Sequence, residues 1–381
     1  MNLKSDNIKI GLLYFLWIGS SAAWLPMFTL YFEKIGFNGT QIGVLASIIP
    51  VTMMIGQPFV SVLADKYGRL RLLLLVLLLT ASTMIGLLIK GGFLYFFIIT
   101  ALFSLSYAPI NPLVDSTVLD YVESSPSSTY SRIRIWGSIG WMSLTYLTGI
   151  FVATHELYWI FIIGSGMLVL TAILSSTIKR PGTSLKGQVI TFRETKNVVL
   201  VPRILIFLLI LLLYGIGTIP INTFYSIYLN KIGASTKIIG LSFAIQAFSE
   251  LPFLFIASHL VKRYGALPLT TVALIMSGIR ILLYTQINNP YVALCIDTTN
   301  GICYSLFLVS AVEYLNKIVP AKLRATGQSL FWASYYGAGV MLGNLFTGFL
   351  YDHSGIRFAF AIDGIILLVT SLIAVFMIRR K

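Results

Sequence analysis

The sequence predicts an all-α protein that crosses a membrane twelve times, with its helices arranged as two related six-helix bundles. Hydrophobic residues make up 57% of the 381 residues, and charged residues only 10%. A soluble domain carries about 25% charged residues, so an ordinary soluble enzyme is excluded. The spacing of the apolar segments and an internal repeat give the number of spans and their grouping.

The apolar segments are about 20 residues long, which is the length that a helix needs to cross the hydrocarbon core of a bilayer. Twelve such segments are separated by short polar stretches. They lie at residues 10–33, 40–64, 70–90, 93–119, 133–154, 157–178, 203–229, 236–260, 267–287, 290–316, 323–350 and 356–378. Because the number of spans is even, we expect both ends of the chain on one side of the membrane.

The Lys and Arg residues are divided unequally between the two sides. Of the 27, 21 fall on the side of the two termini, five fall on the other side, and Arg280 lies within a span. Cytoplasmic loops carry the excess of basic residues, so both termini are predicted to be cytoplasmic. The net charge of +14 then faces anionic lipid headgroups rather than nucleic acid.

The two halves of the chain resemble each other. Lys34-Ile35-Gly36 recurs as Lys231-Ile232-Gly233, and Tyr67-Gly68 as Tyr264-Gly265, both after 197 residues. The longest polar stretch lies between the halves, so we predict two parallel repeats of six spans each. The predicted parts are an N-terminal bundle (1–178), a cytoplasmic linker (179–202) and a C-terminal bundle (203–381).

Asp115 and Arg134 are the charged residues that we expect to define a site in the first half. A carboxylate inside an apolar span costs free energy unless a partner or water reaches it, and Arg134 is the nearest candidate partner. Gly137 and Gly140 allow a neighbouring helix backbone to come close. We expect the fourth and fifth spans, which carry these residues, to form one wall of a cavity. Two aromatic residues, Trp141 and Trp24, are also expected to line it.

The second half has its own ionisable residues within spans. Glu250 and Arg280 lie on consecutive spans and are expected to pair with each other. Asp297 and Asn300 are three residues apart on the tenth span, so they share a helix face. Asp363 lies about two turns into the last span, where we expect it to meet water at the outer surface.

Residues 61–71 form a motif at the predicted cytoplasmic turn between the second and third spans. Asp65 at a helix end can accept hydrogen bonds from backbone amides or basic groups, and Gly68 allows a tight reversal. The stretch resembles the signature loop of the major facilitator superfamily, with Ser61 in place of a glycine. That resemblance implies a gate that closes the cytoplasmic side, formed by Asp65, Lys66, Gly68 and Arg69.

Residues 130–141 are similar to the lactose permease-like group of this superfamily, and more closely to its proton-linked nucleoside and phenylpropionate permeases. The likeness extends to Arg324 through Leu330 and Gly348 through Asp352. It implies that Asp115 and Arg134 hold a sugar, and that Trp141 stacks on the sugar ring. It also assigns substrate and proton coupling to Glu250 and Arg280.

The sequence departs from that group at several positions, two of which bear on solute contact and proton coupling. Asn300, which we expect to contact the solute, stands where the group usually has a histidine, and Cys303 stands where lactose permease has a proton-carrying glutamate. The remaining candidates for a proton carrier are Glu250 and Asp297.

These patterns predict a transporter and not an enzyme. We expect a monomer without cofactor or metal that moves a sugar, glycoside or nucleoside across the cytoplasmic membrane by alternating access, coupled to protons. One alternative is an aromatic carboxylic acid held by Arg134 or Arg280. Others are uncoupled or efflux transport and, ranked last, a membrane-embedded enzyme with Asp115 and Glu250 as acid and base.

Overall fold

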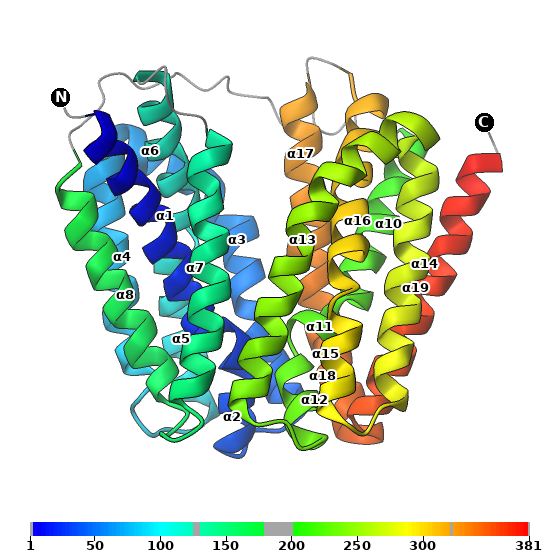
Figure 1. The fold of residues 1–381 in the computed structure, drawn as a ribbon, viewed down its shortest axis with the longest axis horizontal. Coiled ribbons are helices and arrows are strands. Elements are labelled where there is room, and N and C mark those ends of the chain that lie inside the picture. Colours follow the sequence, from blue (N-terminus) through cyan, green and yellow to red (C-terminus); the bar gives the residue numbers. More distant parts are fainter. Residues whose placement is uncertain (1–2, 125–129, 179–200, 321–322, 380–381) are drawn as a thin grey trace. The chain divides into compact units, whose positions relative to one another are not determined.

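The structure, a computed structural model, describes residues 3–124, 130–178, 201–320 and 323–379, and within these ranges the chain is helical with short turns and has no strand (Figure 1). The side chains of residues 57–67 and a few others beside the gaps are not described. The chain forms two compact units. The first unit contains Met1–Ile35, Val51–Leu185 and Ala234–Ala244, and the second contains Gly36–Pro50, Lys186–Gly233 and Ile245–Lys381.

The first unit is a bundle in which α1 packs against α7 and α8, and α4 packs against α5, α6 and α8. A core of aromatic rings surrounds Trp24, whose ring lies 5.0 Å from that of Phe103 and 5.1 Å from that of Phe28. The helices of this unit are α1 (Leu3–Trp24), η1 (Leu25–Met27), α2 (Phe28–Lys34), α3 (Gly39–Tyr67, from Val51 on), α4 (Arg69–Gly86), α5 (Phe93–Tyr107), α6 (Ile110–Ser124), α7 (Tyr130–Phe151) and α8 (Trp159–Ser176).

In the second unit α14 packs against α16 and α19, and α10 packs against η3 and α19. Two of its spans are broken into shorter helices, and a third contains a π-helical segment. Its helices are α10 (Pro202–Gly217), α11 (Ile219–Asn222), α12 (Tyr225–Lys231), α13 (Thr236–Tyr264, from Ile245 on), α14 (Ala266–Gln286), α15 (Pro290–Asp297), α16 (Asn300–Ile318), α17 (Arg324–Trp332), the π-helical η3 (Ala333–Gly339), α18 (Val340–Ser354) and α19 (Ile356–Arg379).

The internal repeat is present in the backbone as well as in the sequence. The bounds of α2 and α12, and those of α3 and α13, differ by 197 residues at both ends. Gly68 and Gly265 end the longer pair in the left-handed region, with φ of 87° and 89°, a conformation that favours glycine. The repeated turn predicted from the sequence is therefore confirmed.

The first residues of α3 belong to the second unit, where the Asp352 carboxylate binds them. It accepts hydrogen bonds from the backbone N–H of Gly39 at 2.5 Å and of Thr40 at 2.7 Å. An acidic group at a helix N-terminus satisfies unpaired donors and the positive end of the helix dipole. At the corresponding start of α13, within the first unit, the Thr236 hydroxyl donates to the Gly149 carbonyl oxygen at 3.0 Å.

The described helices fit a membrane environment. Nine of them are long and apolar enough to span a bilayer, and α10 is a shorter apolar helix. Each of the twelve predicted segments falls on described helices, but the exact number of spans stays a prediction. The predicted linker lies outside the described residues apart from its last two.

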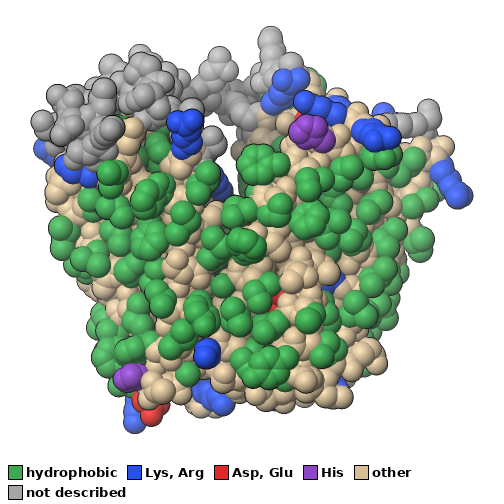
Figure 2. Space-filling model, viewed as in Figure 1, with side chains coloured by type: hydrophobic (Ala, Val, Ile, Leu, Met, Phe, Trp, Pro, Cys, Tyr) green, Lys and Arg blue, Asp and Glu red, His purple; other side chains and the backbone are tan. Residues whose placement is uncertain are grey.

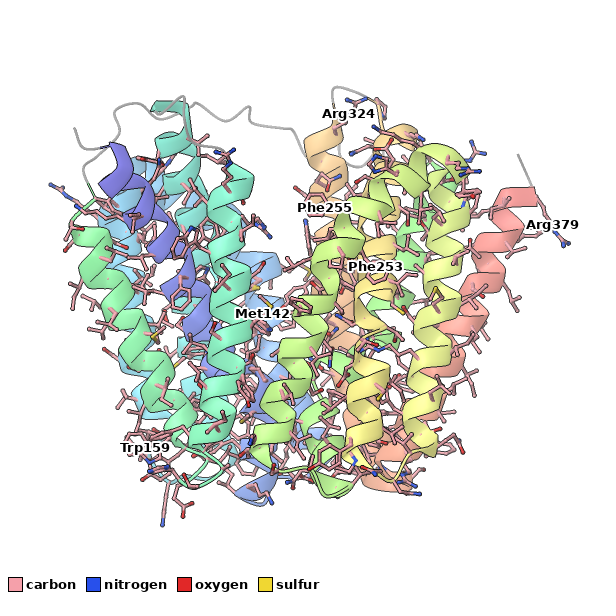
Figure 3. The ribbon with its side chains drawn as sticks, in the orientation of Figure 1. Met142, Trp159, Phe253, Phe255, Arg324 and Arg379 are labelled. Atoms are coloured by element: carbon pink, nitrogen blue, oxygen red, sulfur yellow. The ribbon has the colours of Figure 1, made fainter. Side chains whose placement is uncertain are left out.

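Apolar side chains cover the visible face of each unit between its ends (Figure 2). Phe255 on α13 is 75% exposed. Within the second unit, Arg324 and Arg379 extend toward the same end (Figure 3). Such a surface suits hydrocarbon with charged residues at the headgroups.

Candidate functional site

A hydrogen-bonded cluster surrounds Asp115 in the first unit. Asp115 Oδ1 accepts from the Tyr14 hydroxyl, and also from the Tyr130 hydroxyl at 3.1 Å. Asp115 Oδ2 accepts from Asn111 Nδ2 at 3.2 Å. The Tyr130 oxygen in turn accepts from Arg134 Nη1 at 2.9 Å. The predicted acid and arginine therefore belong to one cluster, but Tyr130 joins them and they form no direct ion pair.

Local helix geometry brings most of this cluster together. Asn111 and Asp115 are four residues apart on α6, and Tyr130 and Arg134 are four apart on α7, so each pair shares a helix face. Tyr14 comes from α1, which approaches α7 closely at a glycine. A methyl group at Gly140 would lie 2.5 Å from the Phe15 carbonyl oxygen. The predicted role of this glycine in close helix approach is confirmed.

The tryptophans near this cluster differ in their surroundings. Trp17 Nε1 donates to Asn111 Oδ1 at 3.2 Å, which places an indole beside the polar group. Trp141 is half-buried on α7. Trp24 is 0% exposed and packs among the rings of the core. The expectation that Trp24 lines a cavity is therefore not met in this structure, and Trp17 is also buried, at 2% exposed.

A second cluster, buried in the second unit, is built around Arg280. The Arg280 side chain is 3% exposed, and its Nη2 lies 3.4 Å from Asp297 Oδ1. Its Nη1 donates to Asn300 Oδ1 at 2.5 Å. Its Nε donates to the Tyr284 hydroxyl at 3.2 Å. The positive charge is thus neutralised and hydrogen-bonded inside the unit.

Asn300 stands between Arg280 and Glu250. While its Oδ1 accepts from Arg280, its Nδ2 donates to Glu250 Oε1 at 2.7 Å. The predicted direct pairing of Glu250 with Arg280 is therefore corrected: the arginine pairs with Asp297, and an amide links it to Glu250. Gly301 permits this arrangement, since a methyl group there would overlap the Ser249 carbonyl oxygen on α13.

Asp297 is completely buried and receives several donors on one oxygen. Its Oδ1 accepts from Tyr225 at 2.8 Å, from Gln246 at 2.9 Å and from Tyr284 at 2.7 Å, in addition to the contact with Arg280. Asp297 ends α15, and Asn300 begins α16. The single helix expected over both residues is interrupted at Thr298 and Thr299, yet both side chains still reach the guanidinium of Arg280.

The described residues contain no group of three or more His, Cys, Asp or Glu side chains placed to hold a metal ion. The clusters around Asp115 and Arg280 contain hydrogen-bonding groups instead, namely carboxylates, guanidinium groups, phenols and amides. Such groups bind polar organic molecules and exchange protons.

A family model described as MFS_1 like family matches residues 7–362. The chain belongs to this family. As a member of it, the protein is a multi-pass membrane transporter and not an enzyme, and the superfamily resemblance predicted from the sequence is confirmed.

Two sequence relatives and one solved structure illustrate the likeness of this MFS transporter to others. The uncharacterised transporter YwbF of Bacillus subtilis (strain 168) is 28% identical, over 93% of this chain and 89% of that protein. The maltose permease of Geobacillus stearothermophilus is 26% identical, over 97% and 94%. The crystal structure of the nucleoside transporter NupG has the same fold, with a TM-score of 0.88 and 19% identity over the whole of both chains.

The predicted gating loop of the MFS transporter is described in part. Gly68 forms the turn before α4. Arg69 Nη1 lies 3.0 Å and 2.9 Å from the two carboxylate oxygens of Asp120 on α6. The Asp65 and Lys66 side chains lie outside the described residues. Asp120 was not predicted from the sequence. The usable signal was an acid in the last turns of the fourth span and a base in the first turn of the third, at the same predicted side of the membrane.

Asp363 of the transporter is 0% exposed. The expectation that it meets water at the outer surface is wrong, because α19 packs against α10, α11, α14 and α18. Its surroundings differ from those of both clusters described above.

Proposed function

We propose that this transporter moves a sugar or a nucleoside across the cytoplasmic membrane by alternating access, coupled to protons. Its relatives include maltose, sucrose and nucleoside permeases, aligned over 91% or more of this chain. The solved structures that share its fold include a D-xylose-proton symporter, with a TM-score of 0.71. We also propose that the protein acts as a monomer with both termini in the cytoplasm and its basic side against anionic lipid.

The observation that carries the substrate proposal is the hydrogen-bonded chain from Asp115 through Tyr130 to Arg134. An acceptor, a phenol and a guanidinium in sequence suit a ligand with several hydroxyl groups. Arg134 is exposed, and only one of its five N–H groups is used in the bond to Tyr130. Trp141, which is half-buried on α7, supplies a flat surface that a sugar ring or a base would contact.

Within the second unit, we assign proton coupling to Glu250 rather than Asp297. Asp297 has a guanidinium and three further donors around one oxygen. Adding a proton to such a carboxylate would weaken its ion pair and displace donors that its charge attracts. Among the described side chains, Asn300 alone donates to the Glu250 carboxylate, so gaining or losing a proton disrupts fewer bonds.

The test is uptake into proteoliposomes that contain the purified full-length protein. The solutes are maltose, sucrose, uridine and phenylpropionate, each with and without an imposed pH gradient. We expect uptake of a sugar or nucleoside that the gradient raises above equilibrium. Asp115→Asn and Arg134→Ala should abolish that uptake, whereas Glu156→Gln, which changes an exposed acid, should not. Wild-type uptake by Asp115→Asn or by Arg134→Ala would contradict the assignment of the site.

The exposed guanidinium of Arg134 favours one second candidate, an aromatic carboxylic acid bound through its carboxylate. In that case phenylpropionate would be the transported solute. Arg134→Lys would then retain charge but lose the bidentate geometry, and should weaken phenylpropionate uptake far more than it weakens sugar uptake.

A further inference from the structure

Asp363 is a buried carboxyl group that neither polar cluster uses. It lies on α19 and is 0% exposed. Its Oδ2 accepts a hydrogen bond from the Thr347 hydroxyl on α18 at 2.8 Å. Its Oδ1 is buried and has no hydrogen-bond partner among the described residues. In those residues no cation pairs with it.

The charged groups on the helices around α19 are engaged elsewhere. On α14, Arg280 binds Asp297 and Asn300, and Tyr284 donates to Asp297. On α18, Asp352 binds the start of α3, and His353 contacts the Phe349 carbonyl oxygen. On α10, Arg203 lies in the first turn, at the opposite end of the helix from Gly217, and the Tyr214 ring stacks on Phe307. The short helix α11 has no titratable residue. On α19 itself, Arg357 donates to the Ile287 carbonyl oxygen, and Arg379 lies at the far end.

An ionised carboxylate without a counter-ion is unfavourable in such a place, and a bound proton removes the charge. A metal cation fits less well. Cations such as sodium and calcium need several oxygen ligands, whereas Asp363 has one polar side chain, Thr347, within hydrogen-bonding distance. A proton needs only the carboxyl oxygen itself.

The same residue lies where a membrane span is interrupted. The span that begins with α10 ends its first helix at Gly217 and resumes as α11 at Ile219 (Figure 1). A methyl group at Gly217 would lie 3.0 Å from the Asp363 carbonyl oxygen, so the interruption packs directly on α19 at this residue. Interrupted spans are where transporters commonly bind their coupling ions and move.

Thr347 would transmit a change at Asp363 to the same interruption. While Asp363 is ionised, the Thr347 hydroxyl donates to it. When Asp363 carries a proton, the acid O–H donates to the Thr347 oxygen, and the threonine hydroxyl is then free to donate to the backbone of its own helix. That backbone contacts the interruption at Gly343, where a methyl group would lie 2.9 Å from the Ile216 Cα atom.

We infer that Asp363 is a second proton-binding group of this transporter, which takes up and releases a proton during each cycle and couples it to movement at the α10–α11 interruption. This inference rests on the proposed proton coupling and adds a site to it. Uptake forms the carboxyl O–H bond and breaks an O–H bond of a hydronium ion, and release reverses this step, with water accepting the proton.

The first test needs no substrate. Infrared difference spectra of the reconstituted full-length protein are recorded between acidic and alkaline pH, and the carbonyl-stretch absorption of protonated carboxyl groups is compared between variants. We expect a titrating band that is missing in Asp363→Asn and retained in Glu313→Gln, which removes a half-exposed acid on α16. An unchanged titrating band in Asp363→Asn would overturn the inference. Loss of the band on adding sodium at constant pH would also overturn it, in favour of a metal cation.

The second test separates coupling from transport, with the solute that the wild type accumulates in the uptake panel. Asp363→Asn should exchange this solute at equal concentrations across the membrane, but should not accumulate it when a pH gradient is applied. Accumulation at the wild-type level would contradict the inference. If the wild type transports none of the panel solutes, the proposed function fails, and the infrared test still decides whether Asp363 titrates.

Discussion

Tyr130 donates a hydrogen bond to Asp115 over 3.1 Å, and this phenol is what connects the carboxylate to Arg134. A direct ion pair would occupy both charges. A phenol between them leaves the guanidinium most of its donors and the carboxylate an acceptor for a ligand. The position of Tyr130 therefore keeps the Asp115 carboxylate and the Arg134 guanidinium from pairing directly.

Replacing Tyr130 with phenylalanine should weaken solute binding while leaving the fold intact. A hydrogen bond to a charged group contributes about 1.5–3 kcal/mol, so we expect affinity to fall by more than about tenfold. The measurement is the concentration dependence of uptake in proteoliposomes. Tyr291→Phe, which removes a hydroxyl from an exposed residue of α15, is the matched control. Equal losses in the two variants would mean that the Tyr130 hydroxyl has no specific role.

Removing one member of the Arg280 and Asp297 pair should destabilise the protein more than removing both charges. A buried charge left without its partner costs about 3–5 kcal/mol, whereas a neutral pair of similar size costs much less. Arg280→Gln and Asp297→Asn should each lower the thermal unfolding temperature in detergent. The double variant should recover part of the loss. A double variant whose loss equals the sum of the two single losses would show that the pair is not energetically coupled.

Replacing Glu250 with glutamine should abolish gradient-driven accumulation and preserve exchange at equal solute concentrations. Glutamine keeps the size of the side chain and its acceptor for Asn300 but cannot take up a proton. Solute accumulation and exchange are measured in the same vesicles, with Glu313→Gln as the control. If accumulation is retained, Glu250 has no coupling role, and Asp363 is the next candidate.

The contact of Arg69 with Asp120 should affect the transport rate more than it affects stability. Both side chains are partly exposed, so the pair itself contributes about 1 kcal/mol or less. If it helps to hold the gate, Arg69→Ala and Asp120→Asn should change the maximal uptake rate to a similar extent, and the double variant should change it no further. Additive rate changes would argue that the two residues act separately.

Parts of both clusters could be predicted from the sequence, and their limits have a physical cause. Asn111 with Asp115, Tyr130 with Arg134, and Arg280 with Tyr284 are each four residues apart on a helix, so their proximity follows from helix geometry alone. The helices themselves follow from the length and apolar character of the segments. These features depend only on residues that are near each other in the chain.

The other members of the clusters depend on how distant helices pack. Tyr14 reaches Asp115 from another helix, and Gln246 reaches Asp297 in the same way. Arg280 pairs with Asp297 and not with Glu250 because of where the helices lie relative to one another. The spacing of these residues along the sequence does not predict those positions. The burial of Asp363 likewise results from packing of α19 on several sides, which its distance from the end of a span does not reveal.

We propose that the hydrogen-bonded chain of Asp115, Tyr130 and Arg134 binds the transported solute. The most direct measurement is solute binding to the purified wild type, Asp115→Asn, Arg134→Ala and Glu156→Gln by isothermal titration calorimetry, with the solute that the uptake panel identifies. We predict comparable affinity for the wild type and Glu156→Gln, and a loss of more than about tenfold for each of the other two, since each removes a hydrogen bond that involves a charged group. Wild-type affinity in Asp115→Asn or in Arg134→Ala would contradict the claim.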